Sequence, residues 1–408
     1  MDAEPLAPAP RVVIADRRLF VLVLGALSMM APLSHDMYLP ALPGIGRTLG
    51  IDEATTVATL SAFVIGFAVG QLIWGPVGDR FGRRGPIVVG LLLYVAASFA
   101  CANAGSGAAL VGCRFIQAIG GCAPVVLAQA MVRDAYERRD GAHVLSLMLL
   151  VGNIAPLLAP TIGGAILVWL GWRSIFLALG LFGAFSLLGL VLLPETLPPE
   201  RRHPRPRRDL VLGYLSLFGH RRYLGYLLTA GCYGGAFFSW LAGSSFVFIG
   251  YYHVPVQYFG FVFSGGVVAM MAANFLNRAL IRRLDPDHVL RFGLAIASLA
   301  GLASIAVASH PEGRLWLMAP VLWIFVGSQA LIGPNATAGA LADFPDRAGM
   351  AAALLGATRS GCGAVGGMCV GWFADGTPWP TAAVIGSLSA AALVSNLLFI
   401  RTRPPGQA

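Results

Sequence analysis

Three charged side chains interrupt long apolar stretches of this 408-residue chain, and their chemistry calls for an explanation first. They are Asp36, Arg114 and Arg359. A charge inside a hydrocarbon layer is costly, so an intramembrane acid or base faces a water-filled cavity or a partner, and it often marks an ion pathway. Asp36 is therefore the strongest candidate for a proton-binding residue. The alternative is a static buried acid that only holds two helices together.

Asp36 and Arg114 fall at similar depths if each apolar stretch forms a helix. At 1.5 Å per residue, Asp36 lies about 26 Å along the first stretch, and Arg114 lies about 9 Å below the outer end of the antiparallel fourth stretch. The two side chains could therefore pair, and moving them apart would change the proton affinity of the acid. We interpret the neighbouring His35 as a hydrogen-bonding residue of a cavity or helix contact rather than a second proton site.

Arg359 falls about 15 Å along the eleventh stretch, near the middle of a hydrocarbon core. It either lines a substrate cavity and biases selection towards neutral or anionic compounds, or it pairs with a neighbouring helix. Polar and flexible side chains on other stretches could line the same cavity, which we expect to be mostly apolar. The predicted substrate-binding set is His35, Asp36, Gln117, Met148, Asn335 and Arg359.

The composition requires elements that cross a membrane. Hydrophobic residues make up 57% of the chain and charged residues 12%, whereas soluble domains carry roughly 25% charged residues. Apolar blocks of about 20 residues are long enough to span the hydrocarbon. They predict twelve helices at residues 19–42, 56–77, 86–104, 108–131, 143–167, 174–193, 224–249, 258–280, 288–308, 315–341, 349–373 and 380–400.

The net charge of +9 comes from arginine alone, since the chain has no lysine. If the N-terminus is cytoplasmic, 23 arginines lie on the cytoplasmic side and 3 on the outer side. That bias is the usual signal of membrane orientation, so it predicts both termini inside and argues against nucleic-acid binding. The six cysteines all fall within predicted spans, and none has the spacing of a metal site or a disulfide.

A basic segment divides the chain into two six-helix halves. We predict an N-terminal bundle at 18–194, a basic cytoplasmic linker at 195–222 and a C-terminal bundle at 223–401. GPVGDRFGRR, which ends at Arg84, has a weaker echo in NRALIRRLDP, which ends at Pro286. Two such repeats are the organisation of major facilitator transporters.

Several motifs resemble that superfamily. Gly75 to Arg84 resembles motif A between helices 2 and 3, "RFIQAIGG" from Arg114 resembles motif B with Ala118 replacing a glycine, and "APTIGG" from Ala159 resembles the antiporter motif C. "HDMYLPALP" from His35, "LPETL", "GPNATAGAL" and "RAGMAAALLG" are similar to the bicyclomycin and chloramphenicol resistance branch, Bcr/CflA. The resemblance covers roughly residues 18 to 400.

This resemblance implies roles for individual residues. Asp36 and Arg114 would carry proton coupling, and Pro160, Gly163 and Gly164 would form a pivot that prevents leak. Ion pairs that form in one conformation and break in another suit a gate, although positive-inside topology alone would also explain the arginines. The predicted cytoplasmic gate comprises Gly78, Asp79, Arg80, Gly82, Arg83, Arg84, Arg133 and Asp134.

We therefore expect an all-α membrane protein that exports small, largely hydrophobic drugs, such as chloramphenicol- or bicyclomycin-like antibiotics, by proton antiport and alternating access. Its partners would be the drug, protons and the lipid bilayer of a bacterial inner membrane. We expect a monomer that uses no cofactor and no metal. A transporter of a physiological metabolite is the alternative. An enzyme or sensor is disfavoured because the sequence shows no catalytic motif and no phosphate-binding loop for ATP.

Overall fold

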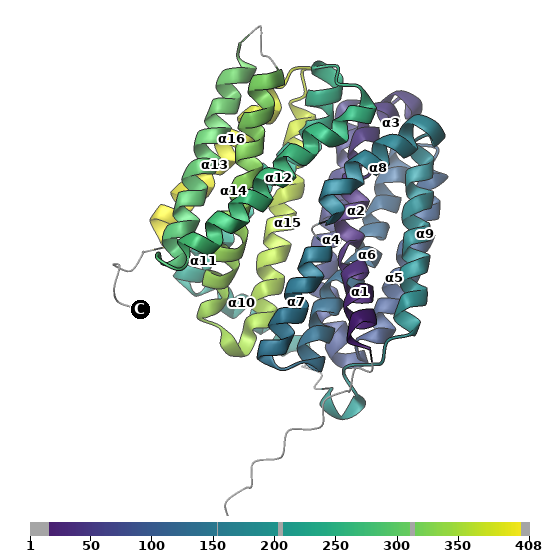
Figure 1. Ribbon diagram of the computed structural model, residues 1–408, viewed down its shortest axis with the longest axis vertical. Helices are drawn as coiled ribbons and strands as arrows, with labels where there is room; N and C mark the ends of the chain where they lie inside the picture. Colours follow the sequence, from purple (N-terminus) through teal and green to yellow (C-terminus); the bar gives the residue numbers. More distant parts are fainter. Residues whose placement is uncertain (1–15, 153, 203–206, 311–314, 401–408) are drawn as a thin grey trace, which may run out of the picture.

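The computed structural model describes residues 16–152, 154–202, 207–310 and 315–400, and within these ranges its regular structure is entirely helical. Helices α1–α9 lie side by side in one half of the molecule and α11–α16 in the other (Figure 1). The long helices run roughly parallel to one another (Figure 1). Because a backbone in hydrocarbon must satisfy its own hydrogen bonds, helices are one of the two structures that can span a membrane.

The first predicted span is not one continuous helix. It breaks after Asp36, where α2 ends, and resumes through a 3-10 turn that includes Pro40. Proline lacks the N–H that an uninterrupted helix would need at that position. The elements of this segment are α1 (Arg17–Ser28), α2 (Met30–Asp36), η1 (Leu39–Ala41) and α3 (Leu42–Leu49).

Short loops and side-chain caps set the limits of most other helices. Asp52 caps α4 by accepting from the Thr55 backbone N–H at 2.8 Å, and Ser106 and Asp285 cap α6 and α13. In the N-terminal half the helices are α4 (Glu53–Phe81), α5 (Arg84–Ala102), α6 (Gly107–Ala135), α7 (Arg138–Gly152), α8 (Ile154–Leu170) and α9 (Trp172–Val191). In the C-terminal half they are α11 (Arg221–Ser245), the π-helix η3 (Phe246–Tyr251), α12 (Val256–Leu280), α13 (Pro286–Ala308), α14 (Leu315–Ala342), η4 (Pro345–Arg347), α15 (Ala348–Trp372) and α16 (Trp379–Phe399).

The described residues contain ten helical segments that are long and apolar enough to cross a membrane, so the chain is a multi-pass membrane protein. The other two predicted spans have different forms. The fifth corresponds to α7 and α8, between which residue 153 lies outside the described residues. The eleventh is α15, whose 25 residues are rich in glycine and alanine and include Arg359.

The predicted linker contains more structure than the sequence suggested. Within it, η2 (Pro199–Arg201) follows the first half, and the 12-residue helix α10 (Arg207–Phe218) packs against α11 and α15. This helix was not predicted because the run of Arg and Pro, which occupies only the start of the segment, indicated an unstructured linker.

The two halves meet closely along α4 with α15 and along α8 with α12. We call the end of the molecule with the C-terminus of α4 and the N-termini of α5 and α15 the arginine-rich end. At the opposite end, a Cβ on Gly371 would lie 3.0 Å from the Ala54 Cα, and one on Gly260 would lie 2.6 Å from the Thr161 Cα. Small residues permit such close helix contact, so the opposite end is closed.

We predict that Gly260→Val destabilises this closed arrangement, because the added side chain would meet the backbone of α8 at Thr161. Overpacking of this kind costs roughly 1–3 kcal/mol. Thermal unfolding of the purified protein in detergent should show a lower midpoint than wild type. Gly112→Val is the matched control, since open space surrounds that glycine on α6. Equal shifts for the two variants would contradict the prediction.

Candidate functional site

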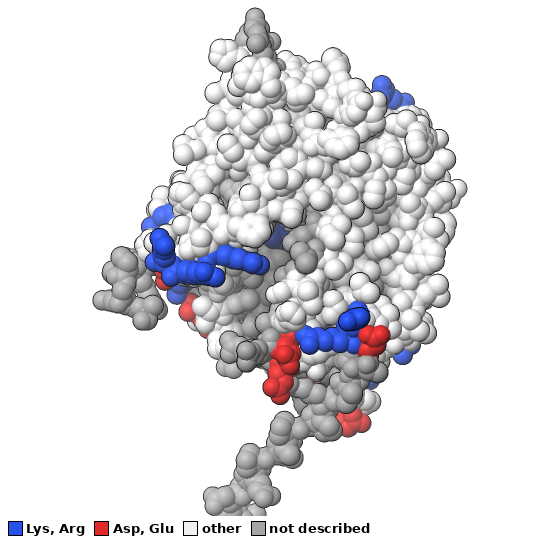
Figure 2. Space-filling model, viewed as in Figure 1, with Lys and Arg blue, Asp and Glu red and all other residues white. Residues whose placement is uncertain are grey.

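A cavity of about 280 Å³ lies between the halves. Its walls come from α11, α14 and α15 of the C-terminal half and from Gln129 on α6. A second hollow of about 310 Å³ shares Gln129 and Ala352 with it and continues to Asp79, Arg83 and Arg133 at the arginine-rich end. Charged side chains gather towards this end on the face shown in Figure 2. The shared lining residues show that the cavity adjoins the hollow at the arginine-rich end.

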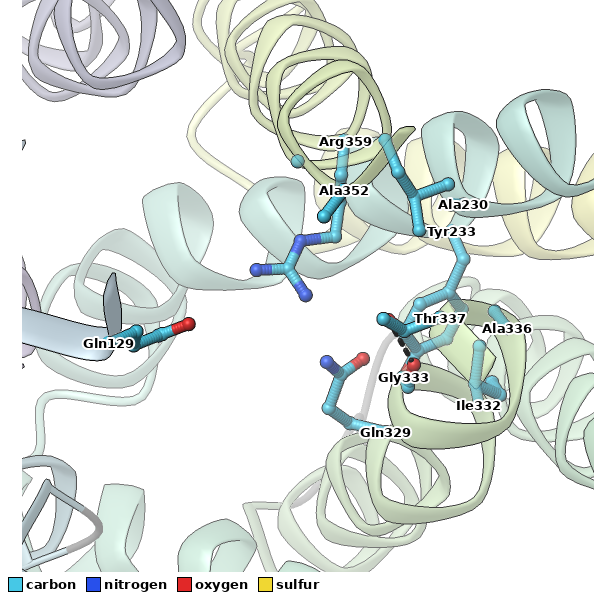
Figure 3. Close-up of a pocket in the computed structure, with 12 residues that line it drawn as sticks. Gln129, Ala230, Tyr233, Gln329, Ile332, Gly333, Ala336, Thr337, Ala352 and Arg359 are labelled. Atoms are coloured by element: carbon cyan, nitrogen blue, oxygen red, sulfur yellow. Dashed lines mark hydrogen bonds between the residues drawn. The ribbon is translucent and has the colours of Figure 1, made fainter. Parts of the chain in front are cut away.

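Arg359 projects into the cavity (Figure 3). Its guanidinium points into open space, with the amide of Gln329 on the facing wall and that of Gln129 reaching in from the other half (Figure 3). Among the described residues it has no ion pair or hydrogen bond. Gly234 on α11 lets α15 approach closely, since a Cβ there would lie 2.6 Å from the Arg359 carbonyl oxygen. The structure thus places Arg359 in the cavity lining.

Asp36 is buried, with 1% of its surface exposed, and it does not pair with Arg114. Its Oδ1 lies 2.8 Å from Nδ1 of His35, while its Oδ2 is buried with no hydrogen-bond partner. Both residues belong to the last turn of α2, and the two side chains meet although adjacent helix positions diverge by about 100°. The His35 ring also packs edge-on to Phe238 of α11, at 6.4 Å between ring centres, so this pair lies at the boundary between the halves.

Arg114 is fully buried and its hydrogen bonds go to neutral groups. It donates to the Ser34 carbonyl at 3.1 Å and to Gln117 Oε1 at 2.6 Å. Gln117 in turn donates to Ser98 Oγ at 2.7 Å, and the Ser34 hydroxyl lies 2.7 Å from that of Tyr94. The last carbonyls of a helix lack intrahelical partners, so the end of α2 makes the Ser34 carbonyl available to Arg114.

Aromatic rings complete the surroundings of Arg114. Its guanidinium carbon lies 4.3 Å from the ring centre of Phe63, 4.6 Å from that of Tyr38 and 5.6 Å from that of Phe176. Rings at this distance attract a cation through their quadrupole. The predicted ion pair with Asp36 is therefore replaced by a carbonyl, an amide and three ring faces.

Of the six predicted substrate contacts only Arg359 lines either hollow; His35 and Asp36 form the pair described above, and the other three also lie outside the lining. Gln117 is buried in the Arg114 network, and Met148 is buried in the hydrophobic core. Asn335 donates to Asn277 Oδ1 at 2.8 Å and joins α14 to α12. These residues were predicted because polar or flexible side chains in apolar stretches could line a cavity, but the face of each helix decides what a side chain meets. Gln129 and Gln329, which do line the cavity, are polar residues in otherwise apolar stretches of α6 and α14.

The predicted gate contains a compact ion-pair cluster. Arg83 lies 2.7 Å from both Asp79 and Asp134 and so connects the loop after α4 to α6. Burial lowers the pKa of Arg83, but the hydrogen bonds and charges of Asp134 and Asp79 outweigh it and hold this pKa above its usual value. Gly82 has φ +89°, a conformation that favours glycine. Gly78 packs against Leu127 where a Cβ would clash.

Glu195 anchors this loop, although it lies 112 residues after Arg83 in the sequence. No local motif predicts this contact. It accepts from the backbone N–H of Arg83 at 2.9 Å and of Arg84 at 3.0 Å. These N–H groups belong to the start of α5, where a carboxylate is favoured by the helix dipole. The glutamate of "LPETL" therefore caps the start of α5.

The other predicted gate arginines do not join the cluster. Arg80 stacks on Phe81 at 5.3 Å from its ring centre, and Arg84 donates to the Val191 carbonyl at 2.9 Å. Arg133 lines the wider hollow, and within the described chain no ion pair links it to Asp79 or Asp134. The prediction grouped these arginines because they lie at the same end of the helices. In the structure each side chain makes a different contact.

The motif C residues lie on α8 beside the break in the first span. A Cβ on Gly163 would meet the Met37 backbone, and one on Gly164 would lie 3.0 Å from the Val256 carbonyl of α12. Pro160 lies within α8 one turn earlier. This stretch thus packs on the Asp36 segment and on the other half at once.

A second polar cluster in the C-terminal half was not predicted. Arg222 on α11 lies 3.0 Å from Asp287 on α13 and 3.8 Å from Asp343, which follows α14. Tyr226 donates to the other Asp287 oxygen. The echo of motif A in the sequence lies near this cluster, but Arg222 precedes that segment by more than fifty residues.

Comparison with known proteins agrees with this architecture. The Major Facilitator Superfamily profile matches residues 24–367. A bicyclomycin resistance protein homolog of Haemophilus influenzae is 36% identical and covers 86% of this chain and 88% of its own. A chloramphenicol resistance protein of Pseudomonas aeruginosa is 31% identical, covering 92% and 89%. The fold is also that of the nucleoside transporter NupG, with a TM-score of 0.77 at 14% identity over 95% of this chain and 100% of the other. The chain therefore belongs to the major facilitator superfamily, and its resemblance to the bicyclomycin and chloramphenicol resistance branch is confirmed.

Proposed function

We propose that this protein is a proton-coupled antiporter that exports small, largely hydrophobic drugs across a bacterial inner membrane by alternating access. The observation that carries the proposal is the cavity between the halves, which is open towards the arginine-rich end and closed at the other. The names of the two relatives, bicyclomycin and chloramphenicol resistance proteins, support drugs as the cargo. The arginine bias supports a cytoplasmic position for the open end and both termini.

Proton coupling is assigned to Asp36. An ionised carboxylate with one buried oxygen unpartnered is costly, and a proton would remove that charge. The acid lies beside His35 at the boundary between the halves, where a change of conformation would alter its access to water. We infer that Arg114 acts on Asp36 through the Ser34 carbonyl and the local backbone, and that its amide and aromatic contacts keep it in place.

The arginine-rich end supplies a gate. Asp79 is 58% exposed on its side chain, and it lines the wider hollow together with Gly349 near the N-terminus of α15. Helix N-termini attract carboxylates, so closing this hollow would bring Asp79 towards that terminus. The cycle in this proposal needs the proton gradient and neither a cofactor nor a catalytic step, and a monomer contains every residue that it uses.

Asp36→Asn should abolish proton antiport, since an asparagine amide does not bind and release a proton at the pH values of the assay. The measurement is drug-induced proton release from acidified proteoliposomes across a panel of antibiotics, and the variant should match liposomes without protein. Asp375→Asn, which changes an exposed acid at the opposite end, should behave as wild type.

Wild-type activity in the Asp36→Asn variant would show that the acid is structural and would remove the coupling residue from the proposal. If wild type itself releases no protons with any antibiotic but does so with a metabolite, the physiological-transporter alternative replaces drug export.

Glu195→Ala should weaken the gate by leaving two N–H groups of α5 without their carboxylate. Loss of such a cap costs roughly 0.5–2 kcal/mol, so the thermal midpoint in detergent should fall and transport should decline. Glu200→Ala removes an exposed acid from the same segment and serves as the control. An unfolding midpoint equal to that of the control would show that Glu195 does not hold the loop.

A further inference from the structure

The cavity contains one strong cation without a counterion. Arg359 extends into it, and among the residues that line it no carboxylate is present. In the adjoining hollow the acid is Asp79, which is already paired with Arg83, while Arg133 and Arg347 add further positive charge. The space between the halves is therefore electropositive.

The polar groups around Arg359 leave hydrogen-bond donors free. Gln129 and Gln329 face the guanidinium from opposite walls (Figure 3). Thr337 uses its hydroxyl proton on the Gly333 carbonyl at 2.9 Å, and Tyr233 is engaged with Ser328 at 3.1 Å. The remaining donors in the cavity are thus the guanidinium and the two amides, which together suit an oxyanion.

The rest of the lining is apolar. Ala230, Ile332, Ala336 and Leu355 cover the walls beside the three donors. A volume of about 280 Å³ lies at the lower end of the range for small-molecule sites. A ligand that matches this site has one polar charged end and a compact apolar body.

We propose that Arg359 forms an anion-binding subsite and that the preferred cargo is a small amphiphilic monoanion, with a carboxylate as its model group. The carboxylate binds the guanidinium in the bidentate manner that suits arginine, the amides of Gln129 and Gln329 donate to it, and the apolar body lies against the alanine and leucine wall. This inference deepens the proposed efflux function and rests on it for the direction of transport.

The subsite has an electrical consequence. Export of a neutral compound in exchange for protons moves only the proton charge, whereas export of a monoanion for the same number of protons moves one further charge in the same electrical sense. Transport of the anion should therefore respond more steeply to the membrane potential than transport of its neutral counterpart.

The test compares chloramphenicol with its succinate ester, which adds a carboxylate to the same neutral body, and with nalidixate as a smaller carboxylate. Equilibrium binding to the purified protein and uptake into inverted proteoliposomes are measured for wild type, Arg359→Gln and Arg359→Lys. Arg47→Gln is the control, because it removes an exposed arginine on α3, at the opposite end and outside the residues that line the two hollows.

Arg359→Gln should lose roughly tenfold to a hundredfold in affinity for the two carboxylates, the scale of a hydrogen bond to a charged group. Its affinity for chloramphenicol should stay within about twofold of wild type, a small change on the same scale. Arg359→Lys should recover part of the anion affinity because it keeps the charge, and Arg47→Gln should match wild type. Valinomycin-imposed potentials should accelerate uptake of the carboxylates more than uptake of chloramphenicol.

Two results would overturn the subsite. One is equal loss of affinity for charged and neutral compounds in Arg359→Gln, which would indicate a structural arginine. The other is wild-type binding of the carboxylates no tighter than that of chloramphenicol. Carboxylate binding that depends on Arg359 but is not followed by transport would leave the subsite standing and refute the efflux proposal, so the two failures are distinguishable.

Discussion

Polar groups inside the bilayer are costly unless they pair within the protein or face a water-filled cavity, and this constraint shapes both the fold and the site. It makes the backbone helical, and it makes each buried charge an anchor or a functional group. The three intramembrane charges meet it in different ways. Arg114 is surrounded by a carbonyl, an amide and aromatic rings, Asp36 has a histidine for one of its oxygens, and Arg359 faces a cavity.

The break in the first span connects two of these solutions. Because α2 ends at Asp36, the Ser34 carbonyl is available for Arg114, next to the contact between His35 and Asp36. A continuous helix would have used that carbonyl in its own backbone hydrogen bonds. Gly163 of α8 packs on the same break. A movement of α8 against the other half would therefore reach the proposed proton-binding residue, Asp36, through backbone contact.

The fold was largely predictable from sequence because hydropathy and arginine placement act over whole segments. The limits of the long helices, the short loops and the motif A turn at Gly82 all follow from local composition. The partners of the individual polar side chains do not follow from local composition. The Asp36–Arg114 pair was inferred from equal depth, but depth leaves the rotation of each helix undetermined. Glu195 reaches a loop more than a hundred residues away in sequence, and Asn335 finds Asn277 on another helix. Such contacts depend on how the helices pack against one another. The apolar pattern of a membrane-spanning helix does not show which face of it meets which neighbour.

The intramembrane arginine of the N-terminal half has partners within the protein, whereas that of the C-terminal half faces a cavity. This asymmetry indicates different roles for the two halves. In the N-terminal half, Arg114 is held by a carbonyl, an amide and aromatic rings, although its Nε has no hydrogen-bond partner, and this arrangement would support the proposed proton site at Asp36. In the C-terminal half, Arg359 is left without partners among the described residues and faces open space across from Gln129. A charge that costs stability in the empty protein gains a partner when cargo binds. Rocking one half against the other would then move the proposed cargo site relative to the proposed proton site, and this relative movement is what coupling between the two requires.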